Sequence, residues 1–128
     1  MLYPIHNLKE RGFRLGATVF LDKIYISKDL NAKLTPVELH IIGAHELYHS
    51  LCEHRIQLIL LWILCLGITP LVNIFRRRME LEADRYAIYK TRDIDAFIGL
   101  MDKLEHGKST HPAKEERIKL AEAMRGKI

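Results

Sequence analysis

The chain of 128 residues has little of several residue types, and each shortage excludes a class of protein. Its two cysteines exclude the disulfide framework of small secreted domains. Its seven glycines and four prolines leave no room for a long flexible linker. The N-terminal residues lack a basic segment followed by an apolar one, so we expect no signal peptide. These shortages predict one domain over residues 1–128, in the cytoplasm or on the cytoplasmic face of a membrane.

The sequence also lacks long runs of like charge, since no block of five like charges occurs. The formal net charge is +4, and the densest basic run is Arg76 to Arg78. This mild excess permits contact with an anionic lipid surface or with nucleic acid but indicates neither. With no other nucleic-acid signal, we expect no nucleic-acid partner. Apolar residues at 48% and charged residues at 28% are typical of a globular protein with a single core.

The residue pattern predicts an α+β fold that is mostly α. Residues 13–27 are rich in β-branched and aromatic side chains, which favours two or three short strands in a small N-terminal sheet. Thr35, Pro36 and Glu38 form a strong helix start, because a threonine cap, a proline at the first position and a glutamate three residues after the cap favour a helix. Helices are expected at about 36–53, 71–90, 93–106 and 113–125.

The first of these helices contains the motif HExxH at residues 45–49. Residues four apart share a face of a helix, so the imidazoles of His45 and His49 can both point at one metal ion. Glu46 projects from the adjoining edge of that face, where it can hold a water molecule on the ion and take its proton. A chance motif on an exposed charged face is the alternative.

A zinc site of this kind needs a third protein ligand, and Glu80 is the candidate. Glu80 and Asp84 lie four residues apart on the next long helix, so one carboxylate can bind the metal while the other accepts the free N–H of a ligand histidine. Surface carboxylates that pair with nearby arginines, or a salt bridge within the helix, are the alternatives.

These segments resemble a known protein family. GAHELYHS followed by ELEADRYA resembles the gluzincin zinc metalloproteases, especially the group that is similar to HtpX and to the CAAX prenyl proteases. The segment from Thr110 to Ile118 resembles the HP…ERI stretch near the end of such catalytic domains, and the length is similar to that of the minigluzincins. The resemblance implies one zinc ion bound by His45, His49 and Glu80. It also implies Glu46 as general base and acid, and Asp84 as the support of a ligand histidine.

His111 and Arg117 lie in the last of these motifs. A histidine before a proline at a helix start is often a cap, and it can instead donate to a developing oxyanion. We expect Arg117 to be structural and to bind a carboxylate near the site.

The apolar insert at residues 56–75 carries no formal charge. One membrane crossing there would separate His49 from Glu80, and a straight helical hairpin would leave the two arms unequal by about 15 Å. We therefore expect the first helix to end or bend soon after Cys52 and residues 56–66 to fold back separately. They would form buried core, a homo-oligomer interface or an anchor on a membrane surface.

Together these features predict a zinc-dependent endopeptidase that cleaves peptides or unfolded proteins lying along an edge strand of the sheet. The alternative is a latent or inactive zinc-binding protein of the same fold that associates with membranes or oligomerises.

Overall fold

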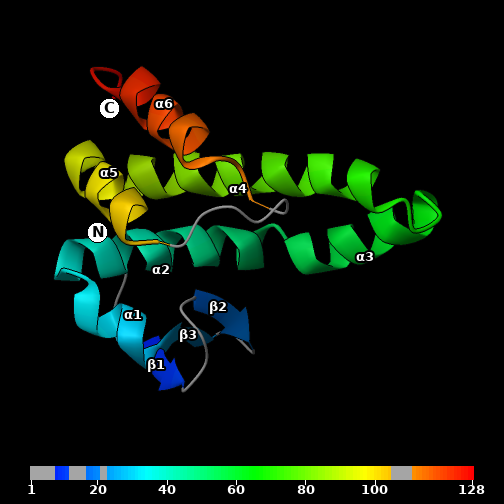
Figure 1. Ribbon diagram of the computed structural model, residues 1–128, viewed down its shortest axis with the longest axis horizontal. Helices are drawn as coiled ribbons and strands as arrows, with labels where there is room; N and C mark the ends of the chain where they lie inside the picture. Colours follow the sequence, from blue (N-terminus) through cyan, green and yellow to red (C-terminus); the bar gives the residue numbers. More distant parts are fainter. Residues whose placement is uncertain (1–7, 12–16, 21–22, 105–110) are drawn as a thin grey trace.

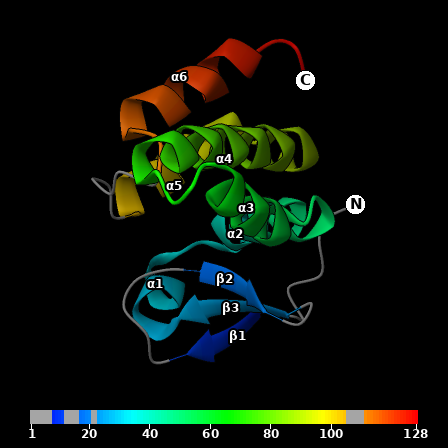
Figure 2. The same cartoon turned by 90° about the vertical axis from the view of Figure 1, so that its right-hand side faces the viewer.

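The computed structural model describes residues 8–11, 17–20, 23–104 and 111–128. The predicted class is confirmed in outline, because most of the described chain is helical and a small sheet precedes the long helices. The elements follow one another as β1 (Leu8–Arg11), β2 (Ala17–Phe20), β3 (Lys23–Ser27), α1 (Lys28–Lys33), α2 (Pro36–Leu51), α3 (His54–Leu64), α4 (Thr69–Thr91), α5 (Ile94–Lys103) and α6 (Lys114–Met124). Figures 1 and 2 show the sheet and α1 on one side of α2, with α4 on the other side and α6 beyond α4.

The three strands form one sheet in the order β1-β3-β2. β3 pairs in parallel with β1 and antiparallel with β2, so β2 is one edge of the sheet. In Figure 2, β2 is the strand that lies beside α2. β1 precedes the segment in which strands were predicted, and part of that segment lies outside the described residues. The short helix α1 was not predicted; the Ser27 hydroxyl caps it by accepting a hydrogen bond from the Leu30 amide at 3.4 Å.

α2 begins where the sequence predicts. Thr35 Oγ1 accepts a hydrogen bond from the Glu38 amide at 3.3 Å, and Glu38 Oε2 accepts one from the Thr35 amide at 2.7 Å. This reciprocal cap satisfies two amides that a helix end otherwise leaves without partners. Lys103 of α5 also donates to Glu38 Oε2 at 2.7 Å, so the same carboxylate ties the start of α2 to α5.

Small residues are buried on the two helices that carry the motifs. Gly43 and Ala44 are buried on α2, and Ala83 and Ala87 are fully buried on α4. Without large side chains at these positions, α2 and α4 can pack closely along their length. The larger members of the core surround this contact and come from β3, α1, α2, α4 and α5; they are Ile26, Leu30, Ile41, Ile88, Phe97 and Leu100.

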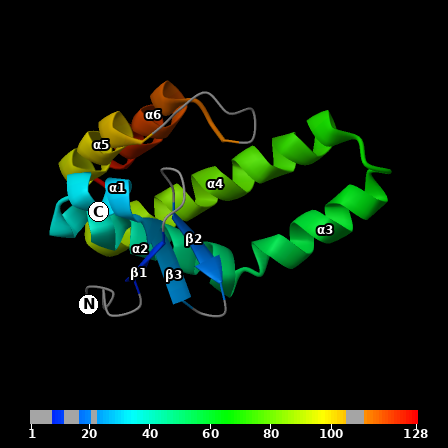
Figure 3. The same cartoon turned by 60° about the horizontal axis from the view of Figure 1, so that its bottom comes forward.

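α2 ends at Leu51, so the predicted end or bend near Cys52 is confirmed. Glu53 then adopts a left-handed backbone conformation with φ 51°, and α3 starts at His54. The prediction that residues 56–66 fold back separately is wrong. α3 continues outward from α2 and pairs with α4 in an antiparallel hairpin that projects from the rest of the molecule (Figures 1 and 3).

The expected mismatch of the two arms is absorbed in two ways. The bend after α2 and the four-residue turn between α3 and α4 contain residues that would be helical in a straight hairpin. α3 also runs at an angle to the axis of α2 (Figure 3), so the arm formed by α2 and α3 extends less far along that axis than a straight helix of the same number of residues. Of the three alternatives for residues 56–66, burial in the core is wrong, because most of their large apolar side chains are exposed.

The remaining helices differ from the prediction by a few residues at their ends, where helices commonly fray. α5 ends at Lys103, earlier than predicted, and the predicted end near Gly107 lies outside the described residues. Within the described part of the chain, none of the helices is both long and apolar enough to cross a membrane.

Candidate metal centre

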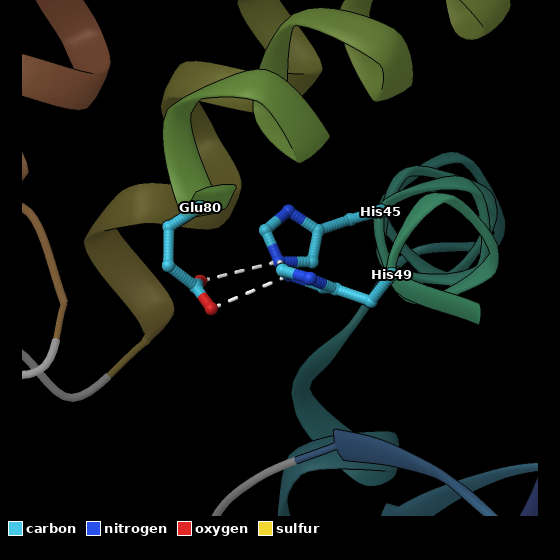
Figure 4. A group of neighbouring side chains, drawn as sticks. All are labelled: His45, His49 and Glu80. Carbon is cyan, nitrogen blue, oxygen red and sulfur yellow. Dashed lines mark hydrogen bonds and ion pairs between the residues drawn. The ribbon is translucent and has the colours of Figure 1, made fainter. Parts of the chain in front are cut away.

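Three potential ligand side chains meet between α2 and α4. His45 and His49 come from successive turns of α2, and Glu80 comes from α4 (Figure 4). The two Nε2 atoms lie 3.1 Å apart. His45 Nε2 is 3.3 Å from Glu80 Oε2, and His49 Nε2 is 3.3 Å from Glu80 Oε1. The close packing of α2 on α4 therefore brings two imidazole nitrogens and a carboxylate around one point, as a candidate metal-binding group.

The other nitrogen of His45 faces a buried carboxylate. His45 Nδ1 lies 2.9 Å from Asp84 Oδ1, and the Asp84 side chain is fully buried. A neutral His45 that donates its Nδ1–H to Asp84 has its lone pair on Nε2, the atom that points at Glu80. Asp84 thus fixes both the orientation of the ring and the form in which it can bind a metal.

Arg117 of α6 compensates the charge of Asp84. Its Nε donates to Asp84 Oδ2 at 2.7 Å and its Nη2 donates to Oδ1 at 2.6 Å, which is the fork geometry of a strong arginine–carboxylate pair. Burial raises the pKa of Asp84, but Arg117 and His45 outweigh burial and lower it overall. Asp84 is therefore an anion, as its role as acceptor requires. The expectation that Arg117 binds a carboxylate near the site is confirmed.

The electrostatics of the centre favour positive charge. Burial alone lowers the pKa of His45, but Asp84 and Glu80 together raise it to about 10. Burial raises the pKa of Glu80, yet hydrogen bonds from His111, His45 and His49 hold it far below the usual range. Glu80 is an anion whose partners are imidazoles, so the centre can receive a cation.

His49 has a partner that the sequence did not indicate. Its Nδ1 lies 2.7 Å from Nδ1 of His54, the first residue of α3. His54 is buried, and burial together with the neighbouring His49 lowers its pKa, so it is neutral near pH 7. Nδ1 of His54 can then accept the Nδ1–H of His49, which leaves the lone pair of His49 on Nε2.

Glu46 and His111 lie close to this group. Burial raises the pKa of Glu46, whose charge also interacts with those of His45 and His49. His111 Nδ1 is 3.2 Å from Glu80 Oε2, and its side chain is half exposed. The N-cap of α6 is Ala113, so His111 is not the helix cap that the sequence offered as one interpretation.

The structure thus brings together six residues that the sequence had singled out, and they are His45, Glu46, His49, Glu80, Asp84 and His111. The sequence missed His54 because five residues along a continuous helix turn a side chain about 140° away from the starting face. Only the end of α2 at Leu51 and the left-handed Glu53 return it to His49.

One of the comparisons with known proteins identifies a family for the chain. Searches of the curated proteins and of the solved structures found no match. A family model described as peptidase family M48 matches residues 56–125, a range that begins after HExxH and includes Glu80, Asp84 and His111. Because this match covers more than half of the 128 residues, the chain belongs to peptidase family M48, whose members are metal-dependent peptidases.

Proposed function

We propose that the chain is a zinc-dependent endopeptidase of the gluzincin type, with one zinc ion held by His45, His49 and Glu80. The observation that carries the proposal is the spacing of the donor atoms. Donors about 2.0–2.1 Å from a tetrahedral zinc ion lie about 3.3–3.4 Å from one another. The two Nε2 atoms lie 3.1 Å apart, and each of them lies 3.3 Å from one of the two carboxylate oxygens of Glu80, which is close to that requirement.

The charges of the surrounding side chains support the same conclusion. Arg117 neutralises Asp84, so Glu80 is the carboxylate whose charge is available to a metal. A metal ion would displace the proton that the raised pKa leaves on His45 near pH 7. Two neutral imidazoles and one carboxylate would then leave a fourth position open, as in catalytic zinc sites. Asp84 and His54 each accept from the outer nitrogen of one ligand imidazole and so hold both rings in the form that binds a metal.

A zinc ion bound there would polarise the carbonyl group of the substrate and lower the pKa of a water molecule. Glu46, which follows the ligand His45 directly, is proposed as the general base that takes the proton from the attacking water. It then gives that proton to the leaving amine. The raised pKa of Glu46 supports this role, because a carboxylate with a higher proton affinity is a better base.

His111 is proposed to act on the oxygen of the scissile carbonyl. Its Nδ1 already reaches the edge of the centre, and its half-exposed ring has room to turn toward a bound substrate. A donor placed where negative charge develops typically contributes a few kcal/mol to transition-state stabilisation.

The proposed substrate is a peptide or an unfolded protein. β2 is an edge of the sheet and lies beside α2, the helix that carries HExxH (Figure 2). An extended peptide can pair with such an edge through its main chain, which accepts many sequences and excludes folded proteins.

A comparison of wild type with Glu46→Gln tests the proposal. Both proteins should bind one zinc ion per chain by elemental analysis, while the variant should lose at least 100-fold in cleavage of a casein-like unfolded protein. Glu116→Gln, at an exposed glutamate of α6, is the matched control and should cleave at the wild-type rate. Equal turnover by wild type and Glu46→Gln would overturn the proposal. Zinc binding without cleavage by the wild type would instead favour a latent protein of the same fold.

A further inference from the structure

The hairpin of α3 and α4 exposes a large apolar surface at its outer end. We call the segment from Ile56 to Phe75 the hairpin tip. Its sequence carries no formal charge, and Figures 1 and 3 show it projecting beyond the other elements. Leu64 at 77% and Leu66 at 89% exposure are the most extreme of its side chains. An apolar surface of this extent normally marks a site of interaction.

The apolar residues of α3 are arranged as a stripe that faces outward. Five exposed residues follow the helical spacing i, i+3, i+4, i+7 and i+8, and they are Ile56, Ile59, Leu60, Ile63 and Leu64. In a helix that only packs on its own domain, such a stripe faces the core and polar residues face the solvent. Here Leu58 and Leu61 between them are half buried, so α3 is apolar on both sides. We therefore expect another molecule to cover the outer face of α3.

Positive charge is concentrated at the base of the hairpin. Arg55 lies at the start of α3, and Arg76, Arg77 and Arg78 follow the tip directly on α4. Arg77 and Arg78 are exposed, although Arg78 also forms a pair with Glu82 at 3.6 Å. The surface thus changes from uncharged and largely apolar at the tip to predominantly basic at the base.

We propose that the hairpin tip inserts into one leaflet of an anionic phospholipid bilayer and that the basic residues at its base bind the lipid phosphates. The order of apolar and basic surface matches the order of hydrocarbon and headgroup in a leaflet. A second copy of the chain offers apolar surface but carries the same formal net charge of +4, so two copies repel each other overall. The charge pattern therefore favours lipid over self-association.

The dimensions agree with insertion into a single leaflet. α3 has 11 residues and is about 16 Å long, about half the 30 Å thickness of a hydrocarbon core. No helix in the described part of the chain can cross a membrane. Glu80 lies four residues beyond Arg76 on α4, so insertion would hold Glu80 about 6 Å beyond Arg76 along the helix, close to the lipid surface.

Trp62 provides a built-in reporter, because it is the one tryptophan of the chain and its side chain is 57% exposed in the hairpin tip. With vesicles of phosphatidylcholine and phosphatidylserine, wild type should pellet with the lipid. Trp62 fluorescence should shift to shorter wavelength and be quenched by lipids brominated on the acyl chain. With vesicles of phosphatidylcholine alone, binding should be much weaker, and added salt should weaken binding to the mixed vesicles.

Variants separate the two parts of the surface. Arg77→Gln combined with Arg78→Gln should weaken binding to the mixed vesicles about 25-fold, since each arginine near an anionic surface contributes about a factor of five. Leu64→Glu should abolish the Trp62 shift. Tyr89→Ser, at an exposed aromatic residue of α4 outside the tip, is the matched control and should bind like wild type. Circular dichroism and zinc content should be unchanged in all variants that are compared.

Wild type that stays in the supernatant of mixed vesicles, with unchanged Trp62 emission, would overturn the proposal. A dimer in the absence of lipid that Leu64→Glu converts to a monomer, without vesicle binding by the wild type, would also overturn it and identify a second copy as the occupant. Vesicle binding is measured without reference to peptide cleavage. Its outcome is therefore independent of the proposed peptidase activity.

Discussion

The Nδ1 atoms of His49 and His54 lie 2.7 Å apart, across the bend that separates α2 from α3. At this distance one of the two rings must donate a hydrogen to the other. If His49 binds a metal through Nε2, its Nδ1 carries the hydrogen and His54 accepts it. His54 then supports the ligand His49 in the same way that Asp84 supports the ligand His45.

His54→Ala should therefore weaken zinc binding about 10–100-fold, the usual effect of removing a group that supports a metal ligand. Competition with a chromophoric chelator measures the affinity directly. His54→Asp keeps an acceptor for His49 and should recover most of the loss. Nitrogen NMR of the zinc form should show the hydrogen of His49 on Nδ1 in wild type and in His54→Asp. Wild-type zinc affinity in a folded His54→Ala protein would remove the proposed role of His54.

The Asp84–Arg117 pair should affect folding and metal binding differently. Arg117→Met leaves the buried Asp84 charge without its main partner, which costs about 3–5 kcal/mol in the free energy of unfolding by urea. Replacing both residues, as Asp84→Leu with Arg117→Met, removes both charges and should recover most of that stability. The double variant should still bind zinc more weakly than wild type, because His45 has lost the acceptor for its Nδ1–H. Wild-type zinc affinity in the double variant would contradict this division of roles.

The parts of the site that could be predicted from the sequence depend on spacing within single helices. Four residues separate His45 from His49, and four separate Glu80 from Asp84, so each pair had to share a helix face. The capped start of α2 fixed the helix that carries HExxH. The sequence left open which carboxylate faces which nitrogen. The structure places Glu80 at the Nε2 atoms and Asp84 at the Nδ1 atom of His45.

The parts of the fold and of the site that could not be predicted depend on backbone conformations that the residue types at those positions do not indicate. Glu53 before α3 and Leu66 after it adopt positive φ values of 51°, which non-glycine residues seldom do, and these conformations bend the chain at the two ends of α3. The apolar composition of α3 left buried core, a homo-oligomer interface and a membrane anchor open, because the sequence of a single chain does not reveal what covers an apolar helix. The contact of His54 with His49 depends on the same bend and was missed for the same reason.

The turn between α3 and α4 contains a glycine that other residues should replace poorly. Gly67 has φ +71°, and a Cβ atom there would lie 3.2 Å from Cζ2 of Trp62. Gly67→Ala should lower the free energy of unfolding by about 1–2 kcal/mol from the backbone conformation alone, with a further loss from crowding Trp62. Gly126 has φ +80° and open space around it, so Gly126→Ala is the matched control. Urea unfolding should show the larger loss of stability for Gly67→Ala. Equal losses for the two variants would mean that the Trp62 side chain can move away from the added Cβ atom without a loss of stability.

Glu38 should make the stability of the chain depend on pH. Burial raises the pKa of Glu38, but Lys103 and the Thr35 amide outweigh burial and lower it below its ordinary value of 4.5. A carboxyl group whose pKa is lower in the folded state contributes stability that is fully present above the unfolded pKa. This contribution is lost as the pH falls through the folded pKa. Wild type should therefore lose its advantage over Glu38→Gln on acidification below about pH 4.5.

At neutral pH, Glu38→Gln should cost about 1–2 kcal/mol, because it removes a charge-assisted hydrogen bond to Lys103 and weakens the cap at Thr35. Other carboxylates of the chain also titrate in acid, so the difference between the two proteins isolates Glu38. Urea unfolding at a series of pH values measures that difference. In proteins that also carry Lys103→Met, the difference in stability caused by Glu38→Gln should be smaller, since the ammonium group of Lys103 is one of the causes of the lowered pKa of Glu38. A difference that stays constant from neutral to acidic pH would show that Glu38 stabilises α2 through shape and packing rather than through its charge.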